Sequence, residues 1–208
     1  MNYCCLFLEC QYLPYGFLCG WWPKMNITEL VSVGLMLFTP VITDIPEDKS
    51  ASVECLALNM YHEARGQGSA GLLGVSSVVL NRVKDKRFPN TICGVVYQGP
   101  TRESWKTRQT PDPNDATFYP VKHRCQFSWY CDGRGDEPRD KKTYQRLLTI
   151  AKSIVYNTIN FIDITDGATH YHADYVNPAW AETKTRTVEI EDHIFYRWEI
   201  GQKGGPVK

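Results

Sequence analysis

The sequence has no excess of charge of either sign. Lysine and arginine number 23, aspartate and glutamate number 23, and the formal net charge is zero. Proteins that bind nucleic acid usually carry a basic excess, so no nucleic-acid partner is expected. The chain also lacks internal repeats and low-complexity tracts. With 208 residues, 43% of them hydrophobic, it is long enough for one compact domain and an N-terminal appendage.

Nor does the chain contain a hydrophobic run long enough for a full membrane span. The apolar run Leu30–Ile42 follows Lys24 and has the rough layout of a signal sequence. In one interpretation Met25 is the natural start and residues 25–45 form a weak signal or membrane anchor. In the other, this stretch is an ordinary terminal helix packed on the domain. The first interpretation predicts an exported or membrane-tethered protein of the periplasm or cell envelope.

Eight cysteines fall into two sets of four. The body set consists of Cys55, Cys93, Cys125 and Cys131, for which three pairings exist. The short loop between the last two favours the pair Cys125–Cys131, and with it Cys55–Cys93. These disulfides would suit an exported protein, whereas four buried free thiols would suit a cytosolic one. Both alternatives stay open on the sequence alone.

Apolar residues recur at helical spacing in three places, which predicts an α+β, mainly α fold. The helices are expected at 53–65, 70–84 and 141–157. Ser52 and Ser69 are placed to cap the first two, and Gly66 is placed to end the first.

The remaining segments divide the chain into three parts. Residues 99–124 carry four prolines and predict a surface excursion with little regular structure. Alternating apolar residues on both sides of Glu191–His193 predict a small β-hairpin. The expected organisation is an apolar N-terminal segment and linker over 1–50, a catalytic domain over 51–200 and a loose tail over 201–208.

Glu63 is the first candidate for chemistry. On the first predicted helix it lies at the edge of the apolar stripe, so that its carboxyl half faces the core. Partial burial and the negative end of the helix dipole both disfavour the charged form and should raise its pKa, as a proton donor requires. The alternative is a surface glutamate paired with Arg65 or a lysine.

Several separated motifs, in a consistent order, resemble the cell-wall hydrolase family that contains the spore cortex-lytic enzymes. The motifs are YHEARGQ, VVLNRV and FPNTICGVVYQ within residues 54–98, then CQFSWYCDG (Cys125–Gly133), ATHYHADYVNPAW (Ala168–Trp180) and HIFYRW (His193–Trp198). The resemblance spans about residues 54–198. It implies a lysozyme-like, lytic-transglycosylase-like single domain that acts on peptidoglycan and uses Glu63 as its catalytic residue.

The mechanism implied by that family needs one carboxylic acid. The acid protonates the oxygen between muramic acid and glucosamine, and its carboxylate then takes the proton of the C6 hydroxyl, which closes a 1,6-anhydro ring. A hydrolytic muramidase is the alternative, in which Asp132 or Asp174 would serve as a second carboxylate. A single domain of this kind fits a phage lysis enzyme as well as a bacterial wall-remodelling enzyme. A monomer is expected.

The candidate substrate-binding residues surround these motifs. Arg65 is a candidate for a sugar or a peptide carboxylate, although a structural ion pair is as well supported. Core packing is favoured over substrate contact for Tyr61 and Phe127, and is the alternative for Trp129. The full set of predicted binding residues is Tyr61, Arg65, Gln126, Ser128, Tyr130, Tyr171 and His172.

Two other classes of function are weighed against the glycosidase. His170 and His172 would share a face of an extended segment, as a zinc peptidase or amidase requires. However, His62 and Glu63 lack the second histidine of an HExxH motif, so no metal or cofactor is expected. A non-catalytic wall-binding domain would need only exposed aromatic side chains, and the presence of Glu63 argues against it.

Overall fold

The computed structural model describes residues 48–109 and 112–201. The α-helices are α2 (Lys49–Ala64), α3 (Ser69–Lys84), α4 (Ile92–Val96) and α5 (Lys141–Val155). The strands are β1 (Thr101–Glu103), β2 (Phe118–Pro120), β3 (His170–Ala173), β4 (Thr185–Ile190) and β5 (His193–Arg197). The described residues also form four short 3-10 helices, η1 (Thr107–Gln109), η2 (Pro113–Asp115), η3 (Ser128–Cys131) and η4 (Ala181–Thr183). The predicted α+β, mainly α fold class is confirmed.

Helix α2 begins one turn earlier than the sequence predicts. Asp48 is its N-cap, and the Asp48 side chain accepts a hydrogen bond of 2.9 Å from the amide of Ser50. The prediction that Ser52 caps the helix is wrong, because Ser52 lies buried inside it and its hydroxyl donates to the Asp48 carbonyl. The helix ends at Ala64, just before Gly66, as expected.

Helix α3 is capped by a residue far away in the sequence. Ser69 was expected as the cap but is the first helical residue, and Gly68 at the N-cap position has no side chain to offer. The carboxylate of Glu191 instead accepts hydrogen bonds from the amides of Gly68, at 2.7 Å, and Gly71, at 3.1 Å. These two hydrogen bonds connect the turn between β4 and β5 to the start of α3.

Helix α5 begins at Lys141, as predicted, and is capped by Asp140, whose side chain accepts from the Thr143 amide. It ends at Val155, two residues before the predicted end. Asn157 has a φ of 54°, in the left-handed region, which stops the helix. The buried face of α5 packs on α2.

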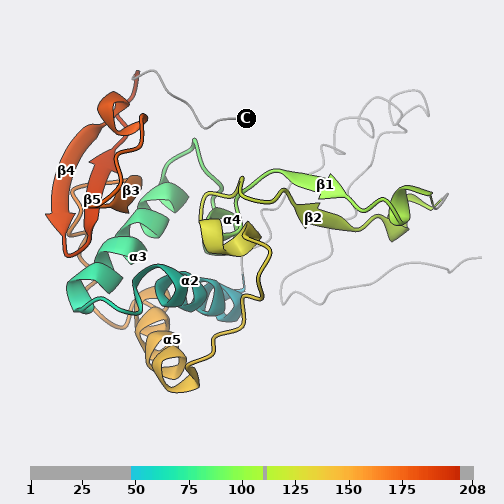
Figure 1. The fold of residues 1–208 in the computed structure, drawn as a ribbon. Helices are drawn as coiled ribbons and strands as arrows, with labels where there is room; N and C mark the ends of the chain where they lie inside the picture. The colour runs from blue at the N-terminus through green and yellow to red at the C-terminus, as the bar shows by residue number, and fades with distance from the viewer. Residues whose placement is uncertain (1–47, 110–111, 202–208) are drawn as a thin grey trace, which may run out of the picture. The chain divides into compact units, whose positions relative to one another are not determined.

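Strands β3, β5 and β4 form an antiparallel sheet in that order (Figure 1). The predicted hairpin is β4 and β5, and β3 adds a third strand that was foreseen only as an extended segment. The sheet packs on α3 through the ring of Phe195, which lies so close to Gly74 that a Cβ there would be 2.8 Å from it. Helix α3 also packs on α2, so it joins the sheet to the helices.

The excursion between Gly99 and Arg124 has more regular structure than expected. Strands β1 and β2 pair antiparallel, with Arg102 opposite Tyr119, and form a hairpin that projects from the helices (Figure 1). Two short 3-10 helices, η1 and η2, lie between these strands. The backbone polar groups of a loop this long need partners, and local pairing supplies them.

Both preferred disulfides are present. Cys55–Cys93 joins α2 to α4, and Cys125–Cys131 closes a short loop around η3. The predicted apolar segment over 1–50, with its candidate start at Met25, lies outside the described residues except for its last three positions. Of the helices that the structure describes, none is both long enough and apolar enough to cross a membrane.

Candidate active site

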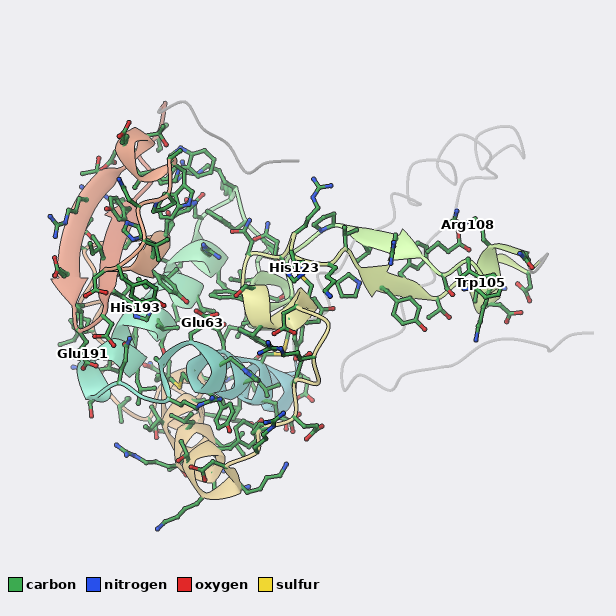
Figure 2. All side chains as sticks on the ribbon, in the orientation of Figure 1. Glu63, Trp105, Arg108, His123, Glu191 and His193 are labelled. Atoms are coloured by element: carbon green, nitrogen blue, oxygen red, sulfur yellow. A yellow bond between two sulfur atoms is a disulfide. The ribbon has the colours of Figure 1, made fainter. Side chains whose placement is uncertain are left out.

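Glu63 lies in the last turn of α2 and lines a cavity of about 280 Å³ between that helix, η3 and β3. Figure 2 shows it within the helical body, near His193 of the sheet. Its side chain is partly buried, as the position at the edge of the apolar stripe predicts. The residues around this cavity are Glu63, Arg82, Gln126, Phe127, Ser128, Tyr171, His172, Ala173, Tyr175 and His193.

Tyr171 on β3 is the direct partner of Glu63. Its hydroxyl donates a hydrogen bond of 2.9 Å to Glu63 Oε2. Burial holds the pKa of the Tyr171 phenol well above its ordinary value, so the phenol keeps its proton and acts as a donor. Burial also raises the pKa of Glu63, and this effect outweighs the Tyr171 hydrogen bond and the charge of Arg82, which lower it. The predicted direction of the Glu63 pKa is confirmed.

Arg82 on α3 is a buried cation in the wall of this cavity. Its Nε donates to the carbonyl of Thr169 at 2.7 Å, and its guanidinium carbon lies 5.2 Å from the ring centre of Phe88 and 5.3 Å from that of Phe127. Burial lowers its pKa to about 10, which still leaves it charged at neutral pH. Its Nη1 is buried without a hydrogen-bond partner among residues 48–109 and 112–201.

The loop before β3 is fixed by the residue next to Arg82. Asn81 donates to Asp163 Oδ2 at 2.9 Å and to the Ala168 carbonyl at 3.0 Å. Burial would raise the pKa of Asp163, but hydrogen bonds from Thr165, Asn81 and Gly167 outweigh it and hold that pKa at about 2. The Asn-Arg pair of the VVLNRV motif thus sets the position of β3, and with it that of Tyr171.

Two histidines complete the far wall. His172 Nε2 lies 3.0 Å from the Tyr196 hydroxyl, and its Nδ1 lies 2.9 Å from the Ala173 carbonyl. The His193 ring centre is 4.8 Å from that of Tyr171. Burial lowers the pKa of His193, so its ring is neutral at neutral pH. Contacts at both nitrogens fix the orientation of the His172 ring, and the His193 ring packs edge-on against Tyr171 beside the cavity.

Six of the seven predicted binding residues line one of two cavities. Gln126, Ser128, Tyr171 and His172 line the Glu63 cavity. Tyr61 and Arg65 line another cavity, of about 230 Å³, together with His62, Trp129 and Asp132. Tyr130 is in neither lining and packs on Tyr97, with ring centres 4.6 Å apart.

Tyr61 has the structural role that the sequence favours. It is buried, and its hydroxyl accepts a hydrogen bond of 3.0 Å from the Asp140 amide at the start of α5. The guanidinium of Arg65 lies 4.7 Å from the Tyr61 ring centre. Trp129 is also buried, stacks on His62 and donates to Asn59 Oδ1 at 3.3 Å.

Four residues of the Glu63 cavity were not singled out from the sequence: Arg82, Ala173, Tyr175 and His193. Arg82 lies in the VVLNRV motif on a predicted helix, and helical periodicity does not show which distant residues its side chain contacts. Tyr175 is 87% exposed, so it lines the part of the cavity that is open to solvent. Tyr175 and His193 lie in the motifs ATHYHADYVNPAW and HIFYRW, and their place in these motifs is the sequence signal that could identify them.

The structure also places the residues on which the two alternative mechanisms depend, a second carboxylate for hydrolysis and histidine ligands for a metal. Asp132 lines the second cavity, and Asp174 is exposed and outside the Glu63 lining, so Glu63 is the one carboxyl among the described residues of that lining. In the described parts of the chain, no three histidine, cysteine or acidic side chains are grouped as metal ligands. The His170 and His172 rings both lie against Trp180.

Burial, together with the charges of Arg82, Lys184 and Arg87, lowers the pKa of His170 from 6.5 to about 3. Between these two values the unfolded chain binds more protons, so this residue makes the fold less stable as the pH falls from about 6.5 towards 3. Well inside this range the free energy of unfolding falls by about 1.4 kcal/mol per pH unit. Urea unfolding at pH 7 and pH 4.5 should therefore show a smaller loss of stability for His170→Asn than for the wild type.

His123 supplies the matched control. It is exposed and has a φ of 60°, a conformation that asparagine accepts. His123→Asn should lose as much stability between the two pH values as the wild type. An equal acid sensitivity of His170→Asn and the wild type would contradict the burial of a neutral His170.

Comparisons with known proteins agree with the resemblance drawn from the motifs. The model of the family described as Cell Wall Hydrolase matches residues 66–196, a range that begins three residues after Glu63. The spore cortex-lytic enzyme of Bacillus cereus is 26% identical over 155 residues, which cover 74% of this chain and 47% of that enzyme. The spore cortex-lytic enzyme of Bacillus subtilis is 37% identical over 144 residues, or 69% of this chain and 36% of the enzyme.

A solved structure is similar as well. The catalytic domain of the germination-specific lytic transglycosylase SleB from Bacillus anthracis is 24% identical, with a TM-score of 0.47, and the match covers 74% of this chain and 98% of that domain. This chain spans just under half the length of the Bacillus cereus enzyme that it matches. The family match covers well over half of this chain, and the chain therefore belongs to the cell wall hydrolase family.

Proposed function

We propose that this chain cleaves the glycan strands of peptidoglycan, at the bond between N-acetylmuramic acid and N-acetylglucosamine, with Glu63 as the acid. Membership of the cell wall hydrolase family supports the substrate. The observation that carries the chemistry is a partly buried carboxyl in a cavity wall, with its pKa raised by burial. Such a carboxyl keeps its proton at a higher pH than an exposed glutamate and can give it to a glycosidic oxygen.

The cavity supports a mechanism with one carboxyl. Tyr171 occupies Oε2 of Glu63, which leaves Oε1 to carry the proton that is transferred. When the bond breaks, the leaving oxygen takes this proton and the muramic sugar becomes an oxocarbenium ion. The new Glu63 carboxylate is stabilised by the Tyr171 hydrogen bond and by the charge of Arg82.

The second half of the reaction restores the protonated Glu63. Its carboxylate takes a proton from the C6 hydroxyl of the muramic sugar, and the C6 oxygen bonds to the anomeric carbon to give a 1,6-anhydro end without water. Retaining and inverting glycosidases use a second carboxyl. Because Glu63 is the one carboxyl among the described residues of this lining, the lytic transglycosylase outcome is favoured over hydrolysis by a muramidase.

An exported or envelope location fits this function, because peptidoglycan lies outside the cytoplasmic membrane. The two disulfides, Cys55–Cys93 and Cys125–Cys131, are typical of proteins that fold in an oxidising compartment. The proposal needs neither a metal nor a cofactor, and one chain contains all the residues of the Glu63 cavity.

Digestion of purified sacculi, with mass analysis of the products, tests the chemistry. The wild type should release fragments with 1,6-anhydro-muramic ends, and Glu63→Gln should cut at least about 10²-fold more slowly because the amide cannot donate the proton. Reducing ends would instead indicate hydrolysis. Unchanged cutting by Glu63→Gln would remove Glu63 from the mechanism, and release of stem peptides from intact glycan would contradict the proposed bond.

The pH profile tests the roles of Tyr171 and Arg82. Cutting should decline as the pH rises through the pKa of Glu63, because the acid must be protonated. Both Tyr171 and Arg82 lower that pKa, so Tyr171→Phe and Arg82→Met should each move this decline to higher pH. The rate of sacculus cutting, measured from pH 4 to pH 9, gives the position of the decline.

Arg65→Met is the control for this profile. Arg65 follows Glu63 closely in sequence but lines the second cavity, so its loss should leave the position of the decline unchanged. If Arg82→Met fails to fold, Tyr171→Phe alone still decides the matter. A decline at the wild-type pH in a folded Tyr171→Phe would show that the hydrogen bond does not act on the catalytic acid.

A further inference from the structure

The arm, which we define as β1, β2 and the described residues between them, carries a cavity that the Glu63 site does not use. Its volume is about 410 Å³. Figure 2 shows Trp105 and Arg108 on this arm, well apart from Glu63. The cavity is lined by Arg102, Glu103, Ser104, Trp105, Lys106, Arg108 and Tyr119.

Exposed aromatic side chains mark this surface. Trp105 is 66% exposed and Tyr119 is 54% exposed. Neither hydrophobic core cluster contains a residue from the described part of the arm, so these rings do not support the fold. Tryptophan, tyrosine and arginine are the residue types that dominate binding surfaces. Their exposure here indicates a surface that a ligand covers.

Three cations line the same cavity as these rings. Arg102 lies directly opposite Tyr119 in the β1–β2 register, so the two share a face of the hairpin. Arg108 is held by a hydrogen bond of 3.1 Å from its Nη2 to the Glu103 carbonyl. Within the described residues, Arg102, Lys106 and Arg108 form no ion pair. Their charges are therefore available to an anionic ligand.

The geometry of the arm is local and built by short-range hydrogen bonds. The Ser104 carbonyl accepts from the Arg108 amide at 3.0 Å, and the Ser104 amide donates to the Thr117 carbonyl at 2.7 Å. The Thr117 amide in turn donates to the Thr107 hydroxyl at 3.2 Å. Trp105 and Lys106 are thus presented by a closed turn, and changing their side chains should leave the core intact.

We propose that the arm cavity is a second contact site for peptidoglycan, in which Arg102, Lys106 and Arg108 bind carboxylates of the peptide stems while Trp105 and Tyr119 cover sugar or alkyl surface. This inference rests on the proposed function for the choice of substrate. Discrete carboxylates fit better than a continuous polyanion, because Glu103 lies in the lining and Asp112 and Asp115 are exposed on the same arm. These three acids balance the three cations, so the arm has no net charge to attract a densely charged membrane or nucleic acid.

Co-sedimentation of the full chain with purified sacculi tests this proposal. All proteins carry Glu63→Gln, so that the sacculi stay intact during the measurement. Trp105→Ala should bind about tenfold more weakly, and the double variant Arg102→Gln with Arg108→Gln should do the same and depend less on salt. Phe118→Ala is the matched control, because Phe118 is 59% exposed on β2 but lies outside the cavity lining.

The nature of the ligand is tested by two further probes. Sacculi whose carboxylates have been converted to amides should bind the parent protein as weakly as unmodified sacculi bind the double variant. Vesicles of anionic phospholipid should show no difference between the parent and Trp105→Ala. A difference on vesicles as large as that on sacculi would assign the arm to a membrane surface and overturn the proposal.

Two outcomes on sacculi would also overturn the arm proposal: unchanged binding by the arm variants, or an equal loss of binding in Phe118→Ala.

Failure of the arm proposal is distinguishable from failure of the proposed function. With Glu63 restored, arm variants should cut a short soluble glycan without peptide stems at the wild-type rate, and sacculi more slowly. Sacculi that the wild type cannot cut would refute the function, whereas equal cutting of sacculi by all arm variants would refute only the arm.

Discussion

The candidate site depends on the contacts that the buried guanidinium of Arg82 makes. Through its bond to the Thr169 carbonyl it ties α3 to the residue just before β3, and through its charge it acts on Glu63. Burying a cation is costly unless hydrogen bonds and neighbouring rings compensate it. The rings of Phe88 and Phe127 lie against the guanidinium, and these contacts together with the Thr169 hydrogen bond compensate part of that cost.

The acidity of Glu63 then follows from opposing effects. Burial alone would raise its pKa and make it a reluctant donor, whereas Tyr171 and Arg82 stabilise the carboxylate that forms when the proton leaves. In the proposed mechanism Glu63 acts first as an acid and then as a base, and such a group needs both kinds of influence. In this fold each comes from a different element: burial from the end of α2, the hydrogen bond from β3 and the charge from α3.

Features that depend on local pattern were predictable from the sequence. The apolar stripes located α2, α3 and α5 to within a few residues, and the alternation around Glu191 located the hairpin. Tertiary contacts were not predictable in the same way. Glu191 caps α3 from the other end of the domain, and Arg82 enters the cavity because α3 packs between the sheet and α2. Neither contact leaves a periodic signal in the sequence.

The proposed chemistry requires Glu63 to keep its proton at a higher pH than an ordinary carboxyl does. The most direct measurement is a difference infrared titration of the carboxyl band, wild type minus Glu63→Gln, across pH 3 to pH 9. A buried Glu63 should give one carboxyl that titrates clearly above the ordinary glutamate value of 4.5. A difference signal at or below that value would show a solvated, ionised Glu63 and would contradict its role as a proton donor.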